Sequence, residues 1–260
     1  MEQLVYLNRW QWAHRFQMEA NSRPARSWLS ERHHAVVVPD RGRLASDQDN
    51  DRVAMDFISA SNTRIQVLEY SELRHLAPPP DLPFVFVHPY SDDEQQATRD
   101  FLTDHRTVPA LVMVWREQDL IRLWLESRAA TNLLASESTA SADPVALRAA
   151  RTMVSEEYNG LASGRGKDTV IHALRALRDA GYSLDPDFWA RAILAADGSF
   201  ESARTVAQFA REITAGRRHR VAKERFRPNI VSIWRDMVEQ EARTRRDVLP
   251  GRPHGGRQTG

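Results

Sequence analysis

Four short, almost continuously apolar runs in the first half of the chain constrain its fold more than any other feature. They are AVVVPD at 35–40, TRIQVLEY at 63–70, PFVFVHPY at 83–90 and PALVMVWRE at 109–117. Each run is rich in β-branched or aromatic residues and is bounded by Pro, Asp or Ser, which is typical of strands. A further run, LIRLWLES at 120–127, is compatible with a fifth strand or with the start of a helix.

Helical windows alternate with these strands. The windows at 46–61 and 91–106 open on Ser and Asp and carry acids in the first turn, where the helix dipole favours negative charge. Apolar strands that alternate with helices predict a mainly parallel sheet of four or five strands with helices on both faces. Residues 1–32 have apolar spacing typical of a helix, with a break expected at Pro24. We therefore predict an α/β domain with an N-terminal helix over 1–134.

The second half of the chain carries helix boundaries instead of strand patterns. Three consecutive windows open on Asp or Ser and end at Gly181, Gly198 or Gly216, so start and stop residues agree three times. Further helices are expected after Pro144 and over 228–246.

These boundaries define the rest of the predicted domain organisation. Residues 135–143 are small and polar and predict a linker, and 144–246 are predicted to form an all-α domain. The Gly-, Pro- and Arg-rich residues 247–260 predict a disordered tail.

Composition limits the classes of function. The chain has 260 residues, 42% of them hydrophobic, which is enough for a substantial core. It has no cysteine, which fits a reducing cytoplasm, and no apolar run near the roughly 20 residues that span a membrane. The net charge is only +1, so binding to a nucleic acid has to depend on a local basic surface.

The loop NGLASGRGKDTV at 159–170 resembles a phosphate-binding loop but departs from it in two respects. Gly160 lies six positions before Gly166, one too many, and Asp168 stands where the metal-binding hydroxyl belongs. The loop also follows a helical pattern and not a strand. We therefore expect no nucleotide cofactor here, but a flexible loop leading to a helix that Asp168 caps.

Metal sites are equally incomplete in the sequence. The run SDQDNDR at 46–52 opens like a calcium loop, but Arg52 replaces the required glycine and Ile58 the bidentate glutamate. The histidines show no zinc-ligand spacing. We predict no bound metal and no cofactor.

Asp40 and Glu69 are the weak catalytic candidates. Asp40 follows a predicted strand, where ligand crevices of open α/β sheets form, and a metal-dependent nuclease holds its ion with such carboxylates. Tyr70, His88 and Asp119 are candidates to approach the same edge. The simpler interpretation is that Asp40 forms a turn after Pro39. No complete catalytic motif is present, so the sequence favours a protein that is not an enzyme.

The strongest local signal is basic. Residues 217–227 carry six basic side chains and one acid, a net charge of +5 over eleven residues. They follow two helices joined by the short turn ADGS, an arrangement typical of a helix-turn-helix. On the second of these helices Ser202, Thr205 and Gln208 are expected to face outward. The candidate nucleic-acid-binding residues are Arg204, Arg211, Arg217, Arg218, Arg220, Lys223, Arg225 and Arg227.

The leading hypothesis is a cytoplasmic nucleic-acid-associated accessory or regulatory protein, most simply a DNA-binding one, that contacts phosphates through this basic run. One alternative is a metal-dependent phosphoesterase or nuclease centred on Asp40. Another is a non-enzymatic module whose basic run docks an acidic protein partner. The sequence does not distinguish DNA from RNA as the nucleic acid bound, and it does not determine the oligomeric state.

Overall fold

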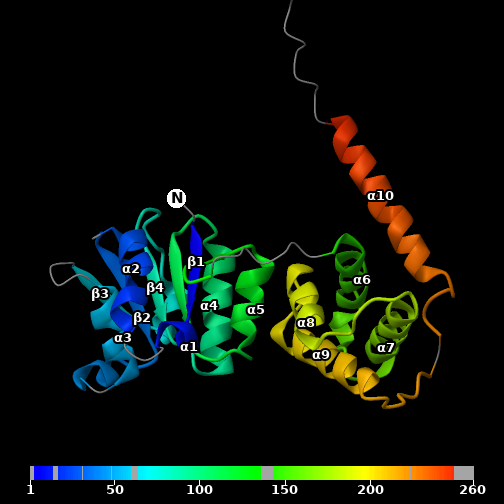
Figure 1. Cartoon of the computed structure of the whole chain (residues 1–260), viewed down its shortest axis with the longest axis horizontal. Coiled ribbons are helices and arrows are strands. Elements are labelled where there is room, and N and C mark those ends of the chain that lie inside the picture. Colours follow the sequence, from blue (N-terminus) through cyan, green and yellow to red (C-terminus); the bar gives the residue numbers. More distant parts are fainter. Residues whose placement is uncertain are drawn as a thin grey trace, which may run out of the picture. The chain divides into compact units, whose positions relative to one another are not determined.

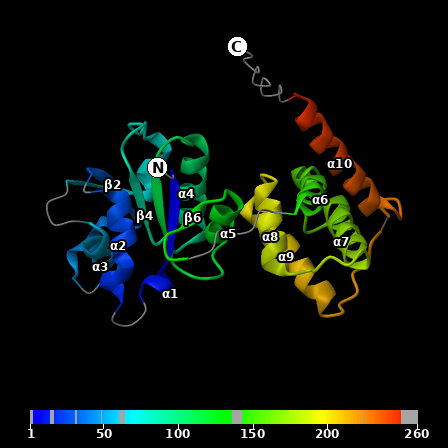
Figure 2. The ribbon, with the colours of Figure 1, turned by 45° about the horizontal axis from the view of Figure 1, so that its top comes forward.

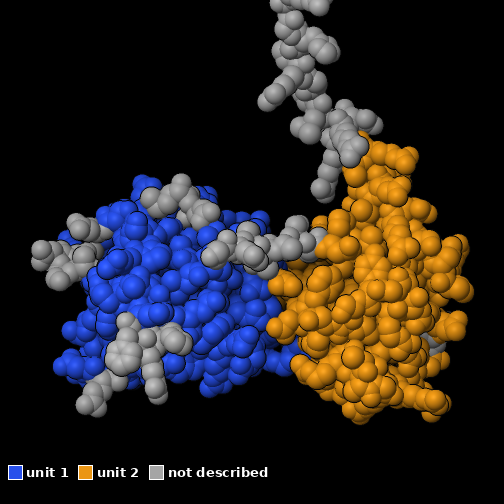
Figure 3. Space-filling model, in the orientation of Figure 1, with its two compact units in different colours: residues 1–141, 198–204 blue, residues 142–197, 205–260 orange. Residues whose placement is uncertain are grey.

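The computed structural model describes residues 3–13, 17–30, 32–47, 49–59, 64–135, 143–222 and 224–248. The chain divides into two compact units, residues 1–141 with 198–204 and residues 142–197 with 205–260 (Figure 3). The predicted linker lies outside the described residues except at Ala135 and Asp143, and so does the predicted tail from residue 249 onward.

The first unit is built on a parallel sheet, which confirms the α/β prediction (Figure 1). Within the described residues it has six strands in the order β3-β2-β4-β5-β1-β6, and every pairing is parallel. The four predicted strands are all present, as β2 to β5. The strands are β1 Leu4–Asn8, β2 His34–Val38, β3 Ile65–Glu69, β4 Phe84–Val87, β5 Ala110–Val114 and β6 Thr131–Asn132.

The N-terminal segment differs from the prediction of a helix over 1–32. Residues 4–8 form β1, which pairs with β5 on one side and β6 on the other and is buried from Val5 onward. A short strand buried on both faces has no alternation of its own, so its apolar residues also fit a helical period. The helices α1 Arg9–Trp12 and α2 Met18–Leu29 follow. Pro24 lies inside α2 and does not interrupt it.

Helices cover both faces of the sheet (Figures 1 and 2). Alternate strand residues such as Val36, Val85 and Leu111 pack with α2 and with α3 Asn50–Ile58 in one apolar cluster. The opposite face carries Phe84, whose ring centroid lies 4.9 Å from that of Phe101 on α4 Asp92–Asp104. The run LIRLWLES forms a helix, α5 Leu120–Ser127. The 3-10 turns η1 Arg41–Ala45 and η2 Tyr70–His75 follow β2 and β3.

The second unit is helical throughout its described elements. They are α6 Pro144–Val154, η3 Glu157–Asn159, α7 Gly164–Asp179, α8 Pro186–Ala195, α9 Phe200–Thr214 and α10 Ile230–Val248, with the first turn of α9 assigned to the first unit. Asp143 and Asp185 cap α6 and α8 through their side chains. Among the described residues, no helix has the length and apolar character needed to cross a membrane.

The glycine-rich loop that resembles a phosphate-binding loop has a packing role. Asp168 does not cap α7, as the sequence suggested, but lies in its second turn and is buried. A Cβ atom on Gly166 would overlap the backbone carbonyl oxygen of Gly160. The loop therefore folds back against the start of α7, and a glycine at 166 permits that close approach.

Candidate functional site

The basic segment, residues 217–227, joins α9 to α10 and is held against α7 by three polar side chains. Asp168 accepts a hydrogen bond from the backbone N–H of Ala222 at 3.3 Å. His172 Nδ1 accepts from the N–H groups of Arg225 and Phe226 at 2.9 and 3.2 Å. Arg175 donates to the carbonyl of His219 at 2.6 Å. The described residues of the segment have no regular secondary structure, yet side chains of α7 fix its backbone.

Two arginines of the basic segment are engaged in ion pairs. Arg217 lies 2.6 Å from Glu212, at the end of α9, and Arg225 is largely buried 3.6 Å from Glu156. Both arginines have a structural partner, so neither presents an unpaired charge to solvent. Lys223 lies outside the described residues.

The remaining predicted cations of this unit are exposed. Four arginines, in the last turn of α9 and along the basic segment, have no ion-pair partner within the described parts of the chain. They are Arg211, Arg218, Arg220 and Arg227. Arg204 is also exposed but pairs with Asp92 at 2.8 Å, and both residues belong to the first unit.

The helix-turn-helix formed by α8 and α9 stays a prediction. α8 and α9 are joined by residues 196–199, and Asp197 takes the left-handed conformation with φ 66°. Ser202 was expected to face outward but is buried, whereas Gln208 is exposed and donates to Glu212. The outward face of α9 therefore differs in part from the predicted one.

His219 lies at the centre of a charged group in the basic segment. Burial lowers its pKa, the nearby Glu212 carboxylate opposes this, and the positive charges of Arg217, Lys167 and Arg175 lower it further. Its Nε2 atom is 3.1 Å from Glu212. Lys167, from the glycine-rich loop, thus lies within electrostatic reach of the basic segment.

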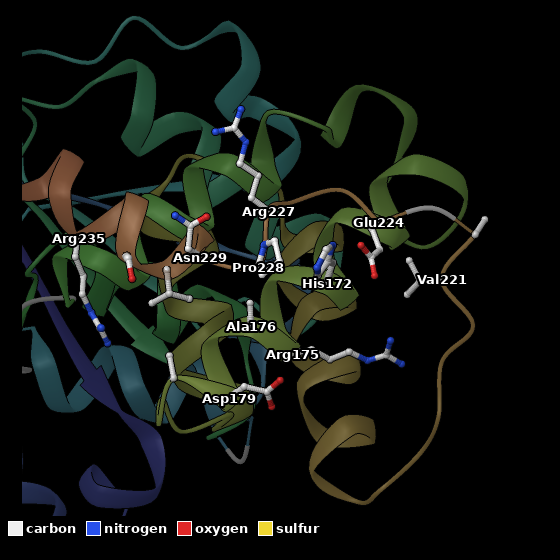
Figure 4. A pocket seen from close by; sticks show the side chains of 14 residues that line it. His172, Arg175, Ala176, Asp179, Val221, Glu224, Arg227, Pro228, Asn229 and Arg235 are labelled. Atoms are coloured by element: carbon white, nitrogen blue, oxygen red, sulfur yellow. The ribbon is translucent and has the colours of Figure 1, made fainter.

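A hollow of about 790 Å³ lies between α7, the basic segment and the start of α10 (Figure 4). Three arginines line it, Arg175, Arg227 and Arg235, against two carboxylates, Asp179 and Glu224. The labelled side chains in Figure 4 come from all three elements and surround the hollow. These five side chains carry one more positive than negative charge, and the rest of the wall includes apolar residues such as Ala176 and Val231.

The side chains of Asp40 and Glu69 both accept hydrogen bonds from backbone N–H groups. Asp40 accepts from the N–H of Gly42 at 2.7 Å, at the start of η1. Glu69 accepts from the N–H of Arg41 at 3.2 Å and forms a capping box with Glu72. No cluster of three potential metal-ligating side chains occurs among the described residues. The turn-forming role considered for Asp40 matches its hydrogen bond.

A second cluster, the edge cluster, lies at the carboxyl ends of the strands, and of its members only His88 was a candidate in the sequence. We define it as Arg9, Arg43, Asp51, His88, Tyr90 and Trp115. β2 and β4 are neighbours, but the chain leaves β2 toward β3 on one side and β4 toward β5 on the other. Ligand sites of open α/β sheets form at such a reversal of strand order.

An Asp-His pair forms the centre of the edge cluster. Asp51, in the first turn of α3, accepts from Tyr90 OH at 2.6 Å and lies 3.0 Å from His88 Nδ1 through the same oxygen. Its other carboxylate oxygen lies 3.4 Å from Arg43. The side chains of Asp51 and His88 are both 0% exposed. Arg43 also pairs with Asp49 at 3.1 Å and stacks over the ring of Tyr90.

His88 has an unusual backbone conformation. Its φ of 44° lies in the left-handed region, which costs a residue other than glycine about 1–2 kcal/mol. Strand alternation would place His88 on the same face as Phe84 and Phe86. Its side chain instead contacts Asp51 at the start of α3, which packs on the opposite face. The strained residue thus brings the ring to the carboxylate.

The surroundings of His88 favour its neutral form. Burial lowers its pKa, the hydrogen bond and charge of Asp51 oppose this, and the positive charges of Arg9 and Arg43 lower it further. Burial also raises the pKa of Tyr90, which therefore stays a hydrogen-bond donor. A neutral imidazole that donates from Nδ1 to Asp51 carries a lone pair on Nε2.

Part of the edge cluster was visible in the sequence. His88 and Trp115 directly follow strands, and His88 was expected near this edge together with Asp40. Asp51, however, is indistinguishable in sequence from the other acids of its helical first turn. Its role depends on the strand order, which sequence patterns do not supply.

Comparison with protein-family models, curated proteins and solved structures finds no match to this chain.

Proposed function

We propose that the protein binds nucleic acid, and that its helical unit contacts the phosphate backbone through the basic segment and the end of α9. The observation that carries this proposal is a group of four exposed arginines that have no ion-pair partner among the described residues: Arg211, Arg218, Arg220 and Arg227. An arginine guanidinium donates two parallel hydrogen bonds and matches the oxygens of a phosphate.

The anchoring of the basic segment supports this role. A freely solvated loop has no side chains of a neighbouring helix holding its backbone, yet here the buried Asp168 and the half-buried His172 both accept from its amides. Binding to an ordered segment loses less conformational entropy than binding to a mobile one. The arginines are therefore presented in a pre-organised arrangement.

The chemistry of these residues favours contact with the backbone of a nucleic acid over reading of its bases. The exposed cations are arginines of a loop and a helix end, and Glu201 and Glu212 place negative charge on α9 itself. Phosphate contacts give affinity without sequence information. We expect DNA and RNA duplexes to compete for the same surface.

The test is duplex binding by the full chain as a function of salt. Binding that depends on phosphate contacts weakens as salt rises, with a slope of about −0.9 per contact in a log-log plot. The triple variant Arg211→Ala, Arg218→Ala, Arg220→Ala is expected to reduce that slope by about 2 to 3. Fluorescence anisotropy with a labelled duplex at several salt concentrations measures both.

A charge-matched control separates contact from net charge. Arg74, Arg106 and Arg151 are also exposed and lie outside the basic segment and α9, so their triple alanine variant loses the same charge. It should retain the wild-type slope. Equal effects of the two triple variants, or duplex binding that salt does not weaken, would exclude the proposal. Stoichiometric capture of an acidic protein in place of duplex would favour the interaction-module alternative.

A further inference from the structure

The edge cluster of the α/β unit, together with Asn8 directly before Arg9, contains buried hydrogen-bonding atoms that lack a partner in the part of the chain that the structure describes. Within the described residues, His88 Nε2, Asp51 Oδ2 and Asn8 Oδ1 have no hydrogen-bond partner, although Asp51 Oδ2 has the ionic contact with Arg43. Buried polar atoms are normally paired, because an unpaired one loses its hydration without compensation. Asn8 ends β1 beside Val114, and His88 follows β4 at the same level on the other side of β5.

All three of these atoms are acceptors when Nδ1 of His88 donates to Asp51. A carboxylate oxygen and an amide oxygen only accept, and the Nε2 atom of this tautomer carries a lone pair. The complementary ligand therefore presents donors, such as an amino group or hydroxyl groups. A simple anion does not satisfy these atoms.

Aromatic rings form the adjacent wall. The Trp115 ring centroid lies 4.9 Å from that of His88 and 4.6 Å from that of Tyr90. The planar guanidinium of Arg9 lies over the Trp115 ring at 4.1 Å and donates an exposed hydrogen bond to Asn50. A flat group already occupies the stacking position, so a flat ligand ring is able to replace it there.

From this juxtaposition we propose that the edge cluster is a binding site for a nucleoside, free or as part of a nucleotide. The base replaces the Arg9 guanidinium on Trp115, and an amino or hydroxyl group of the nucleoside donates to His88 Nε2. Asp51 is the positioning residue that fixes the imidazole, and the left-handed backbone at His88 directs the ring to it. The location at the reversal of strand order is the one that open α/β sheets use for ligands.

Adenosine is the first probe, because it has a base, an amino group and hydroxyls but no phosphate and so cannot bind through the arginines of the basic segment. The full chain is titrated with adenosine by calorimetry, and the histidine side chains are followed by ¹⁵N NMR. We expect saturable binding and a shift of the Nε2 resonance of His88. A parallel titration with ADP shows whether phosphates add affinity.

Two variants test the placement. Trp115→Leu is expected to weaken adenosine binding at least roughly fivefold, since base stacking on an aromatic ring contributes that much or more. Tyr158→Leu, which removes an aromatic residue of the other unit that is 96% exposed, should leave adenosine binding unchanged. Thermal unfolding of both variants checks that they fold.

Three results would overturn the proposal. The first is the lack of saturable binding of both adenosine and ADP at millimolar concentration. The second is binding that a folded Trp115→Leu variant leaves unaltered. The third is binding without any change at the Nε2 resonance of His88.

Discussion

At the scale of single residues, Gly166 illustrates how packing reverses an intrinsic preference. It lies in the first turn of α7, where replacing glycine by alanine ordinarily stabilises a helix by about 0.5–1 kcal/mol. Here the added Cβ atom would meet the carbonyl oxygen of Gly160, a backbone atom that cannot rotate away. We therefore expect Gly166→Ala to lower the free energy of unfolding by about 1–3 kcal/mol, as measured by urea denaturation.

Gly42 offers a contrasting site for that measurement. A Cβ atom there would lie 3.1 Å from a carboxylate oxygen of Asp40, the end of an exposed side chain that can move. Gly42→Ala should therefore cost less than Gly166→Ala. A stabilised Gly166→Ala variant would show that the loop does not pack closely against α7.

Individual site residues were predictable only where a local pattern marks them. Asp40 follows a strand and Pro39, and a turn-forming role was the simpler interpretation of it. Asp51 gave no such signal, because only the tertiary structure brings His88 and Tyr90 to it across more than 35 positions of sequence. The left-handed conformation of His88 is equally invisible in sequence, since the residue is not a glycine and precedes Pro89.

At the scale of elements, a strand could be predicted where turn-forming residues mark its ends and β-branched or aromatic residues fill its interior. The strands β2 to β5 each carry a run of β-branched or aromatic residues between turn-forming residues, and each was predicted. β1 was taken for the start of a helix, because its strand character comes from pairing with β5 and β6 and not from its own sequence. A central strand buried on both faces is the element that local periodicity describes worst.

Among the side chains of α7 that hold the basic segment, His172 contacts two of its amides. His172 accepts from the amides of both Arg225 and Phe226. His172→Ala removes that acceptor without changing any arginine. We expect faster hydrogen exchange at these two amides, and weaker duplex binding with an unchanged dependence on salt, because the phosphate contacts remain but are no longer pre-organised.

Hydrogen exchange followed by NMR and anisotropy titration provide the two measurements. His75→Ala replaces an exposed histidine of the α/β unit and is the matched control. If the amides of Arg225 and Phe226 exchange at the wild-type rate in His172→Ala, the ring does not hold the segment.

At the scale of the whole molecule, the arrangement of layers followed from sequence but the position of its sites did not. Alternation of apolar strands with helices is sufficient to predict a parallel sheet covered on both faces. The strand order cannot be read from any one segment, because it depends on which strands pair with one another in the folded sheet. The edge cluster arises where that order reverses, so it becomes visible only in the folded unit.

Buried neutral histidines also give the molecule a pH-dependent stability. Burial lowers the pKa of His34 and that of His88, while the Arg32 carbonyl opposes the shift at His34 and Asp51 opposes it at His88. In the unfolded chain a histidine titrates near pH 6.5. Below that pH the unfolded chain binds more protons than the folded one, so the free energy of unfolding decreases as pH falls.

We therefore expect a stability that is level from about pH 8 to 7 and declines below about pH 6.5, by at most about 1.4 kcal/mol per pH unit for each such histidine. Urea titrations followed by tryptophan fluorescence between about pH 7.5 and 5.5 measure this above the range in which ordinary carboxylates titrate. His34→Gln preserves a polar side chain and removes one contributor, so its decline should be shallower than that of the wild type. A free energy of unfolding that stays constant, or rises, as the pH is lowered through this range would show that these histidines are not held neutral by the fold.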